Sequence, residues 1–293
     1  MMTEATKSLD TIVEDIYGLF DGEAVDLRPE YLDKFTEELS ALIKERMATS
    51  RNGSEPYLRM SNLGKPDRQL WFDINWTGPT EAFTPENLIK FTYGDILEHL
   101  ILLFARQTGH TVEMEQAEVE LDGVKGHPDA VIDGVVVDVK SAASHQFDKF
   151  ASGDLEKVSN DTFLGGYMQQ LAGYVAAINP DADGAFLVID KTLGKVCLLK
   201  VPNDVLKQYE IEKRVKHVKE VVASEEVPAR CYEPKAKGKS GNYVLPSGCS
   251  YCKHKFHCWS DANGGVGLRT YFYAAGPEYF THVEKEPRVI EEF

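Results

Sequence analysis

Residues 124–141 read Val-Lys-Gly-His-Pro-Asp-Ala-Val-Ile-Asp-Gly-Val-Val-Val-Asp-Val-Lys-Ser, and this stretch decides the fold. Asp133-Gly134 lies between two β-branched runs, which is typical of a two-residue type I′ hairpin turn because both positions need a positive φ. The turn fixes the register of the pairs beyond it, which are Ile132–Val135, Val131–Val136, Ala130–Val137 and Asp129–Asp138. The stretch therefore predicts an antiparallel hairpin that carries two opposed carboxylates.

Side chains alternate between the two faces of this hairpin. One face is apolar and is predicted to pack on the core. The other face carries the ionisable residues, and we predict that it is open to solvent. Its residues are His127, Asp129, Val131, Val136, Asp138 and Lys140.

The opposed carboxylates allow two interpretations. Like charges directly across a strand pair are destabilising, and a divalent cation would compensate them. Mg²⁺ is typically held by one or two carboxylates with waters and substrate phosphates, and a neighbouring ammonium such as Lys140 can bind a phosphate or help to deprotonate a water. Alternatively, Asp129 and Asp138 lie on a solvated face and Lys140 simply neutralises them. The hairpin alone leaves both open.

Composition limits the class of protein. The 293 residues suffice for one large domain or two small ones. The chain starts without a basic and apolar leader, and no run approaches the roughly 18 apolar residues of a membrane span, so we expect a soluble protein of the cytoplasm. A net charge of −15 argues against a basic coat but permits a local basic groove.

The hydrophobic pattern predicts an α/β (α+β) fold in which helices flank a mixed central β-sheet. The expected helices are 8–20, 30–47, 85–108, 163–178 and 203–222, and the expected strands outside the hairpin are 111–121, 184–190 and 195–201. We divide the chain into an N-terminal helical region (1–55), a core (56–230), a cysteine-rich segment (231–262) and a tail (263–293).

Two of these helices carry further polar candidates. Glu98 and His99 lie among apolar residues of the helix that begins at Thr84-Pro85, and Gln170 and Tyr174 lie four residues apart on the helix 163–178. An amide and a phenol on one helix face could position a phosphate or a metal ligand. The alternatives are that the Glu98 side chain reaches solvent and that Gln170 and Tyr174 are a partly exposed polar pair.

The cysteines are clustered. Three of the five, Cys249, Cys252 and Cys258, form a C-x₂-C-x₅-C pattern that indicates a metal site, whereas Cys197 lies in a strand and is expected in the core.

The same region contains lysines interleaved with aromatic residues, as nucleic-acid contacts often are. A solvated lysine-rich loop is the alternative. The candidates for contacts to a DNA backbone are Lys235, Lys237, Lys239, Lys253 and Lys255.

In their order and spacing, these motifs resemble the RecB-like branch of the PD-(D/E)XK nucleases. The matching motifs are Gly94-x₃-Glu98, Gly126-x₂-Asp129, Asp138-Val-Lys140, Gln170-x₃-Tyr174 and the cysteine pattern, over residues 60 to 260. The chain is most similar to members with a cysteine cluster, namely phage-encoded exonucleases, the nuclease domains of AddAB-type helicase-nucleases and the iron–sulfur nuclease of CRISPR adaptation.

The resemblance implies a restriction-endonuclease-like core whose Mg²⁺ or Mn²⁺ is bound by Glu98, Asp129, Asp138 and the carbonyl of Val139. Lys140 would orient or deprotonate the attacking water. Supporting or DNA-positioning roles would fall to Gln170, Tyr174, His99 and His127.

The implied activity is a metal-dependent DNA exonuclease acting on linear single- or double-stranded DNA in phage recombination, repair or degradation. It would work in the host cytoplasm, with a possible recombination or replication partner and an oligomeric state that the sequence leaves open. A structure-specific endonuclease, an end-trimming nuclease and a catalytically silent DNA-binding module are the alternatives.

The chain departs from the family at two points. The adaptation nucleases usually carry His where Glu98 stands, whereas the histidine here, His99, follows one residue later. The family's upstream cluster cysteine is missing from residues 64–71. Cys231 is then the best fourth ligand of a [4Fe–4S] cluster, and His254 or His257 could instead complete a Cys₃His zinc site. On the sequence we prefer zinc.

Overall fold

The computed structural model describes residues 7–22, 25–48 and 56–292. The chain forms two compact units, one of Met1–Gly64 with Thr84–His217 and one of Lys65–Phe83 with Val218–Phe293. The predicted boundary at residue 55 lies outside the described residues. This division groups the described N-terminal helices with the core and residues 65–83 with the C-terminal part, and it separates the two units after His217, where we predicted a boundary at 230.

The first unit is built on a five-stranded mixed sheet, as predicted. Its strands in spatial order are β1 (Val112–Glu113), β4 (Ala130–Ile132), β5 (Val135–Ala142), β6 (Gly184–Asp190) and β7 (Val196–Val201). Strands β5 and β6 are parallel, and the other neighbours are antiparallel. The long strand β5 is thus the centre of the sheet, with a partner on each side.

The β4–β5 hairpin has the predicted register. Ala130 pairs with Val137, and the turn residues Asp133 and Gly134 have φ values of 50° and 83°. These are the positive angles that a type I′ turn requires. The turn sequence therefore determines which hairpin residues share a face.

Helices cover both faces of the sheet. Helices α1 (Ile12–Gly18) and α4 (Pro85–Gln107) pack on the apolar face of the hairpin. Helices α5 (Ser144–Ala151) and α7 (Gly165–Ile178) pack on the opposite face, where Phe150 contacts Phe186. Our prediction of a solvated second face was wrong. Val136 and Asp138 are each only 1% exposed, because β5 is a central strand beneath α7.

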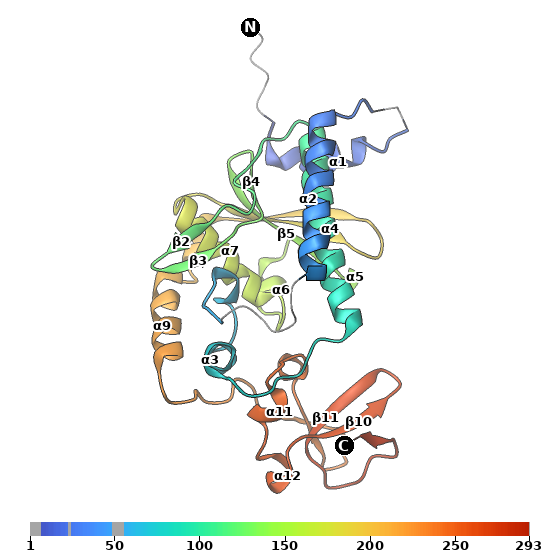
Figure 1. The fold of residues 1–293 in the computed structure, drawn as a ribbon, viewed down its shortest axis with the longest axis vertical. Helices are drawn as coiled ribbons and strands as arrows, with labels where there is room; N and C mark the ends of the chain where they lie inside the picture. The colour runs from blue at the N-terminus through green and yellow to red at the C-terminus, as the bar shows by residue number, and fades with distance from the viewer. Residues whose placement is uncertain (1–6, 23–24, 49–55, 293) are drawn as a thin grey trace. The chain divides into compact units, whose positions relative to one another are not determined.

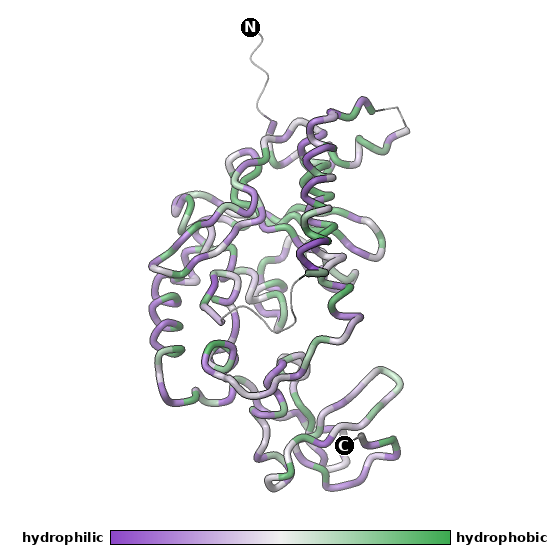
Figure 2. The backbone as a smooth tube through the Cα atoms, in the orientation of Figure 1, coloured by the Kyte–Doolittle hydropathy of each residue, from purple (hydrophilic) through white to green (hydrophobic). Residues whose placement is uncertain are grey.

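Helix α2 (Pro29–Ala48) lies alongside α4 (Figure 1). None of its described residues is fully buried, and its tube is largely purple in Figure 2. Polar contacts hold it in place, including Arg46 Nε to Asp95 Oδ2 at 2.8 Å and an ion pair of Lys34 with Glu115.

The remaining elements of the first unit connect these layers. They are η1 (Leu9–Thr11), η2 (Met60–Asn62), β2 (Val119–Leu121), β3 (Val124–Gly126), α6 (Leu155–Ser159) and α8 (Asn203–Lys207), followed by α9 (Ile211–Ala223), which runs on into the second unit. Two predicted elements are interrupted. Left-handed Met114 and Gln116 (φ 52° and 49°) break the strand 111–121, and Glu210 (φ 43°) breaks the helix 203–222.

The second unit contains short helices and a five-stranded antiparallel sheet. The helices are α3 (Asp67–Asn75), α10 (Ser247–Ser250), α11 (Lys255–Cys258) and α12 (Ala262–Gly265). The strands in spatial order are β12 (Glu291–Glu292), β10 (Arg269–Tyr273), β11 (Gly276–His282), β9 (Tyr243–Val244) and β8 (Lys235–Ala236). Across the described residues, none of the helices has the length and apolar character that a membrane crossing requires.

Candidate active site

The predicted catalytic residues come together at the centre of the first unit. Asp138 lies in the middle of β5, and its Oδ2 is 2.6 Å from Lys140 Nζ. Its Oδ1 accepts a hydrogen bond from Gln170 Nε2 of α7 at 3.1 Å. Asp129, just before β4, accepts the Val139 N–H at 2.7 Å. Helix α7, which packs on β5, therefore supplies a hydrogen-bond partner for Asp138.

Burial makes this cluster electrostatically unusual. Burial raises the pKa of Asp138 to about 7, an effect to which the Asp129 charge adds. Burial and then Asp129 raise the pKa of Glu98 to about 8, and burial also raises the pKa of Asp129. Burial alone would lower the pKa of Lys140, but Asp138 and Asp129 outweigh it and raise that pKa. Three carboxylates thus share one ammonium in a low-dielectric site.

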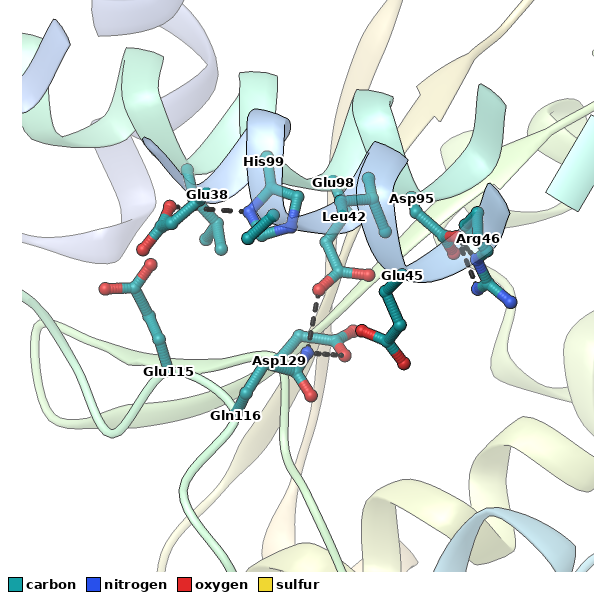
Figure 3. A pocket seen from close by; sticks show the side chains of 12 residues that line it. Glu38, Leu42, Glu45, Arg46, Asp95, Glu98, His99, Glu115, Gln116 and Asp129 are labelled. Carbon is teal, nitrogen blue, oxygen red and sulfur yellow. Dashed lines mark hydrogen bonds and ion pairs between the residues drawn. The ribbon is translucent and has the colours of Figure 1, made fainter. Parts of the chain in front are cut away.

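Gln116 is part of the cluster, although our sequence reasoning missed it. Its Nε2 donates to Glu98 Oε1 at 2.9 Å and lies 3.4 Å from Asp129 Oδ1 (Figure 3). Gln116 lies in the segment that we had read as a continuous strand. Gln116 is exposed, and a lone glutamine in such a segment has no sequence signal, because the left-handed backbone that directs it toward the two carboxylates is visible only in the fold.

Gly126 of the Gly126-x₂-Asp129 motif has a packing role. A Cβ at this position would lie 2.7 Å from Met60 Cβ and 2.8 Å from Tyr174 Cε1. Only glycine lets β3 approach Tyr174 this closely. Tyr174 is 3% exposed, and burial raises the pKa of its phenol above the usual range.

Two cavities of opposite character reach Asp129. A cavity of about 480 Å³ beneath α2 is mostly acidic, and its charged lining includes Glu38, Glu45, Arg46, Asp95, Glu98 and Glu115 (Figure 3). A cavity of about 310 Å³ is lined by Tyr57, Arg59, Ser61, Glu118, Lys125, Gly126, His127, Gln170 and Tyr174. The second cavity combines cationic and aromatic groups beside the same carboxylate.

The two histidines proposed as supporting residues lie at different cavities. His99 lines the acidic cavity, where its Nδ1 is 3.4 Å from Glu38 Oε2. His127 is exposed and lines the other cavity. Their roles stay predictions, and His127 is the one that lies beside the cationic and aromatic groups.

The donor atoms of the cluster suit a hard divalent cation. They are the carboxylate oxygens of Glu98, Asp129 and Asp138, which Mg²⁺ prefers. The buried Asp138 Oδ2 has the Lys140 ammonium, 2.6 Å away, as its neighbour. As the side chains stand in the described residues, no three His, Cys, Asp or Glu groups already converge on a single ion position.

The second unit brings four cysteines to one small cavity. Cys231, Cys249, Cys252 and Cys258 line a space of about 30 Å³, and all are free thiols. Arg68 Nε lies 3.1 Å from Cys258 Sγ, so a cationic donor faces one sulfur. Burial raises the pKa of Cys249 to about 12 and also raises those of Cys231 and Cys252. Four cysteines around one cavity beside a cationic donor, with Cys231 exposed and the other three half-buried, suit a thiolate-bound metal group.

The histidines near this cavity have other contacts. His254 Nε2 lies 2.9 Å from Asp73 Oδ1, and its ring stacks on Phe72. The His257 ring stacks on Trp76 with the ring centroids 3.5 Å apart.

The predicted lysine patch requires correction. Lys255 is 2% exposed and forms an ion pair with Glu81, so it is not available to a DNA backbone. Lys253 lies 3.1 Å from Asp73 Oδ1, and Lys237 lies 2.5 Å from Glu278 Oε1. Lys235 and Lys239 are exposed. Acidic neighbours therefore neutralise much of the patch, which the local sequence did not reveal.

Comparison with known proteins gave likenesses of fold. No protein-family model and no curated protein sequence matches the chain. The chain is similar to an alkaline exonuclease from Laribacter hongkongensis, with a TM-score of 0.42 and 17% identity over 58% of this chain and 89% of that chain. It is also similar to a phage-related exonuclease from Haemophilus somnus, with a TM-score of 0.38 and 15% identity over 59% of this chain and 96% of that chain.

Proposed function

We propose that this protein is a Mg²⁺- or Mn²⁺-dependent deoxyribonuclease that hydrolyses phosphodiester bonds. The observation that carries the proposal is the cluster of the buried Asp129 and Asp138 and the half-buried Glu98 around the ammonium of Lys140. Excess negative charge in a buried site needs a cation, and the donor set suits a hard one. A catalytically silent DNA-binding module would have no need for this arrangement.

In the proposed mechanism, Glu98, Asp129, Asp138 and the Val139 carbonyl would hold the ion. A bound Mg²⁺ would supply a water of lowered pKa and polarise the phosphoryl group. Lys140, fixed by Asp138 and by the Tyr167 ring 4.9 Å from its Nζ, orients the attacking water or a phosphate oxygen. Gln170 keeps Asp138 in position through its hydrogen bond at 3.1 Å.

We propose that the DNA strand approaches Asp129 through the cavity that contains Arg59, Lys125 and His127. The Arg59 guanidinium and the exposed Lys125 ammonium, which lies 2.7 Å from Glu118 Oε1, suit phosphates. Tyr57, with the Arg59 guanidinium 4.3 Å from its ring centre, offers a surface for base stacking. The acidic cavity beneath α2 would repel the same backbone. The active site therefore has one side suited to DNA.

Within this class we favour an end-dependent exonuclease with a role in phage DNA metabolism, in line with the motif resemblance. End-labelled linear DNA and covalently closed circular DNA, each with Mg²⁺, Mn²⁺ or EDTA, test this choice. We expect metal-dependent loss of linear DNA and survival of the circles. Rapid loss of closed circles would favour the structure-specific endonuclease.

We further propose that the four cysteines hold a [4Fe–4S] cluster with Cys231 as the fourth ligand, in place of the zinc that we preferred on sequence. All four thiols line one cavity, so Cys231 can supply the fourth sulfur of a [4Fe–4S] cluster. Since Asp73 engages His254, a Cys₃His zinc site has less support. Anaerobic purification with iron and zinc analysis separates the two: several irons per chain support the cluster, and one zinc contradicts it.

A further inference from the structure

Gln116 bridges two of the proposed metal ligands. Its amide nitrogen lies 2.9 Å from Glu98 Oε1 and 3.4 Å from Asp129 Oδ1. Figure 3 shows the side chain extending between the two carboxylates. We infer that Gln116 is a positioning residue of the metal site, which holds the Glu98 carboxylate beside that of Asp129 and so sets the affinity for the divalent cation. This inference rests on the proposed metal-dependent function.

The backbone around Gln116 is held in an unusual conformation. Gln116 and Met114 have φ values of 49° and 52°, which are uncommon for residues other than glycine. The Gln116 N–H donates to the Pro128 carbonyl at 3.0 Å, next to Asp129. Non-glycine residues in this region persist where the surrounding structure fixes them, often at functional sites.

The preceding residue anchors the segment from the other side. Glu115 forms ion pairs with Arg106 of α4 and Lys34 of α2. The Arg106 side chain is 5% exposed, so this anchor is nearly buried. Adjacent residues thus point to different partners, with Glu115 facing the two cations and Gln116 facing the two carboxylates.

The chemistry of an amide suits this position. A glutamine NH₂ has two donor hydrogens, so it can serve one oxygen of each carboxylate. Asp129 Oδ2 accepts the Val139 N–H, so the amide of Gln116 bonds the other oxygen of that carboxylate, Oδ1. An ammonium would neutralise the charge that attracts the cation, and an aliphatic side chain would leave Glu98 free to rotate away. The amide orders the ligands while leaving the site anionic.

The expected effect is on metal affinity more than on turnover. Without the bridge, cation binding would have to order the Glu98 side chain and overcome its repulsion from Asp129. Neither bond of the Gln116 side chain involves Asp138 or Lys140. Once the site is saturated with metal, the reacting groups should therefore be arranged as before.

The test compares Gln116→Met with the exposed Gln208→Met as a matched control. Binding of Mg²⁺ alone is measured by calorimetry without DNA, and the Mg²⁺ concentration for half-maximal cleavage is measured separately from kcat. We expect Gln116→Met to weaken both metal constants about tenfold, the loss of about one hydrogen bond to a charged group, with kcat changed less than about threefold. Unchanged metal binding would overturn the inference.

A second variant covers the case in which Gln116→Met does not fold. Gln116→Asn keeps the amide but is one methylene too short to reach both carboxylates, so we expect the same weakening. Wild-type Mg²⁺ affinity in this variant would contradict a bridging role. If the wild-type protein itself bound neither Mg²⁺ nor Mn²⁺, the proposed function would fail, and that result is distinct from equal binding by wild type and variants.

Discussion

The main-chain N–H of Val139 donates a hydrogen bond of 2.7 Å to the side chain of Asp129. This bond lies just beyond the last paired residues of the hairpin, Ala130 and Val137. It continues the strand pairing with a carboxylate in place of a main-chain carbonyl. Asp129 is thereby fixed beside Asp138. The hairpin register thus determines how the two carboxylates are arranged.

The first prediction is that Lys140→Ala abolishes cleavage and destabilises the metal-free protein. Asp138 is 1% exposed, and its Oδ2 would lose the ammonium 2.6 Å away. Breaking a buried ion pair costs about 3–5 kcal/mol unless the remaining group takes up a proton. Urea unfolding in EDTA at pH 8 measures the loss. Stability equal to that of wild type would contradict the role of Lys140 as counter-charge to the cluster.

The second prediction concerns stability and pH in EDTA. The pKa of Glu98 is raised from 4.5 to about 8 by burial and Asp129, and that of Asp138 is raised from 3.8 to about 7. Between the unfolded and folded pKa values, Glu98 and Asp138 bind more protons in the folded protein than in the unfolded chain. The free energy of unfolding therefore falls as pH rises from about 4 to 8.

Chemical denaturation at several pH values measures this slope. Glu98→Gln should flatten it, and saturating Mg²⁺ at pH 8 should restore much of the lost stability. The scale is about 1.4 kcal/mol for each pKa unit of a single group. Stability that stays constant or rises over this window would count against a buried anionic cluster.

The third prediction is that DNA binding depends on salt through the cavity beside Asp129. Replacing Arg59 and Lys125 together by Gln should reduce the slope of log affinity against log salt by roughly 1.4–1.8, at about 0.7–0.9 for each lost phosphate contact. Lys207→Gln, which removes an exposed lysine that lies 3.0 Å from Asp181, is the matched control. An unchanged slope in the double variant would contradict this prediction and leave Lys235 and Lys239 of the second unit as the candidates for phosphate contacts.

The fourth prediction is that Cys231→Ser removes the proposed cluster, whereas Cys197→Ser does not. Cys231 lines the same cavity as Cys249, Cys252 and Cys258, and Cys197 lies in β7 of the other unit. Iron content and the visible spectrum after anaerobic purification are the readouts. Equal iron in both variants would exclude Cys231 as a ligand.

The parts of the fold that local chemistry determines were predictable. The type I′ turn at Asp133-Gly134 determined the hairpin register, and Thr84-Pro85 marked the start of α4, where the Thr84 hydroxyl accepts the Asn87 N–H at 3.4 Å. The proximity of Asp129, Asp138 and Lys140 also followed from spacing, since they occupy one face of the hairpin.

Features that depend on distant segments were not predictable. The face assigned to solvent is buried because α7, about 30 residues later, packs on it and donates Gln170 to Asp138. Gln116 reaches the carboxylates through a left-handed backbone that replaces the expected strand. Lys255 and Lys253 are paired with Glu81 and Asp73, which precede them by more than 170 residues. Alternation along one strand identifies which residues share a face but not what covers that face.

The measurement that tests the central claim most directly is cleavage of end-labelled linear DNA by wild type and by Asp138→Asn across a range of Mg²⁺ concentrations, with Asp181→Asn as an exposed control. Asparagine keeps the shape of Asp138 and an oxygen for the Gln170 hydrogen bond but removes the charge. We predict Mg²⁺-dependent cleavage by wild type and the control, none in EDTA, and a loss of more than about 100-fold in Asp138→Asn. Cleavage by Asp138→Asn at the wild-type rate, or no cleavage by wild type with either Mg²⁺ or Mn²⁺, would contradict the assignment of this cluster as a nuclease site.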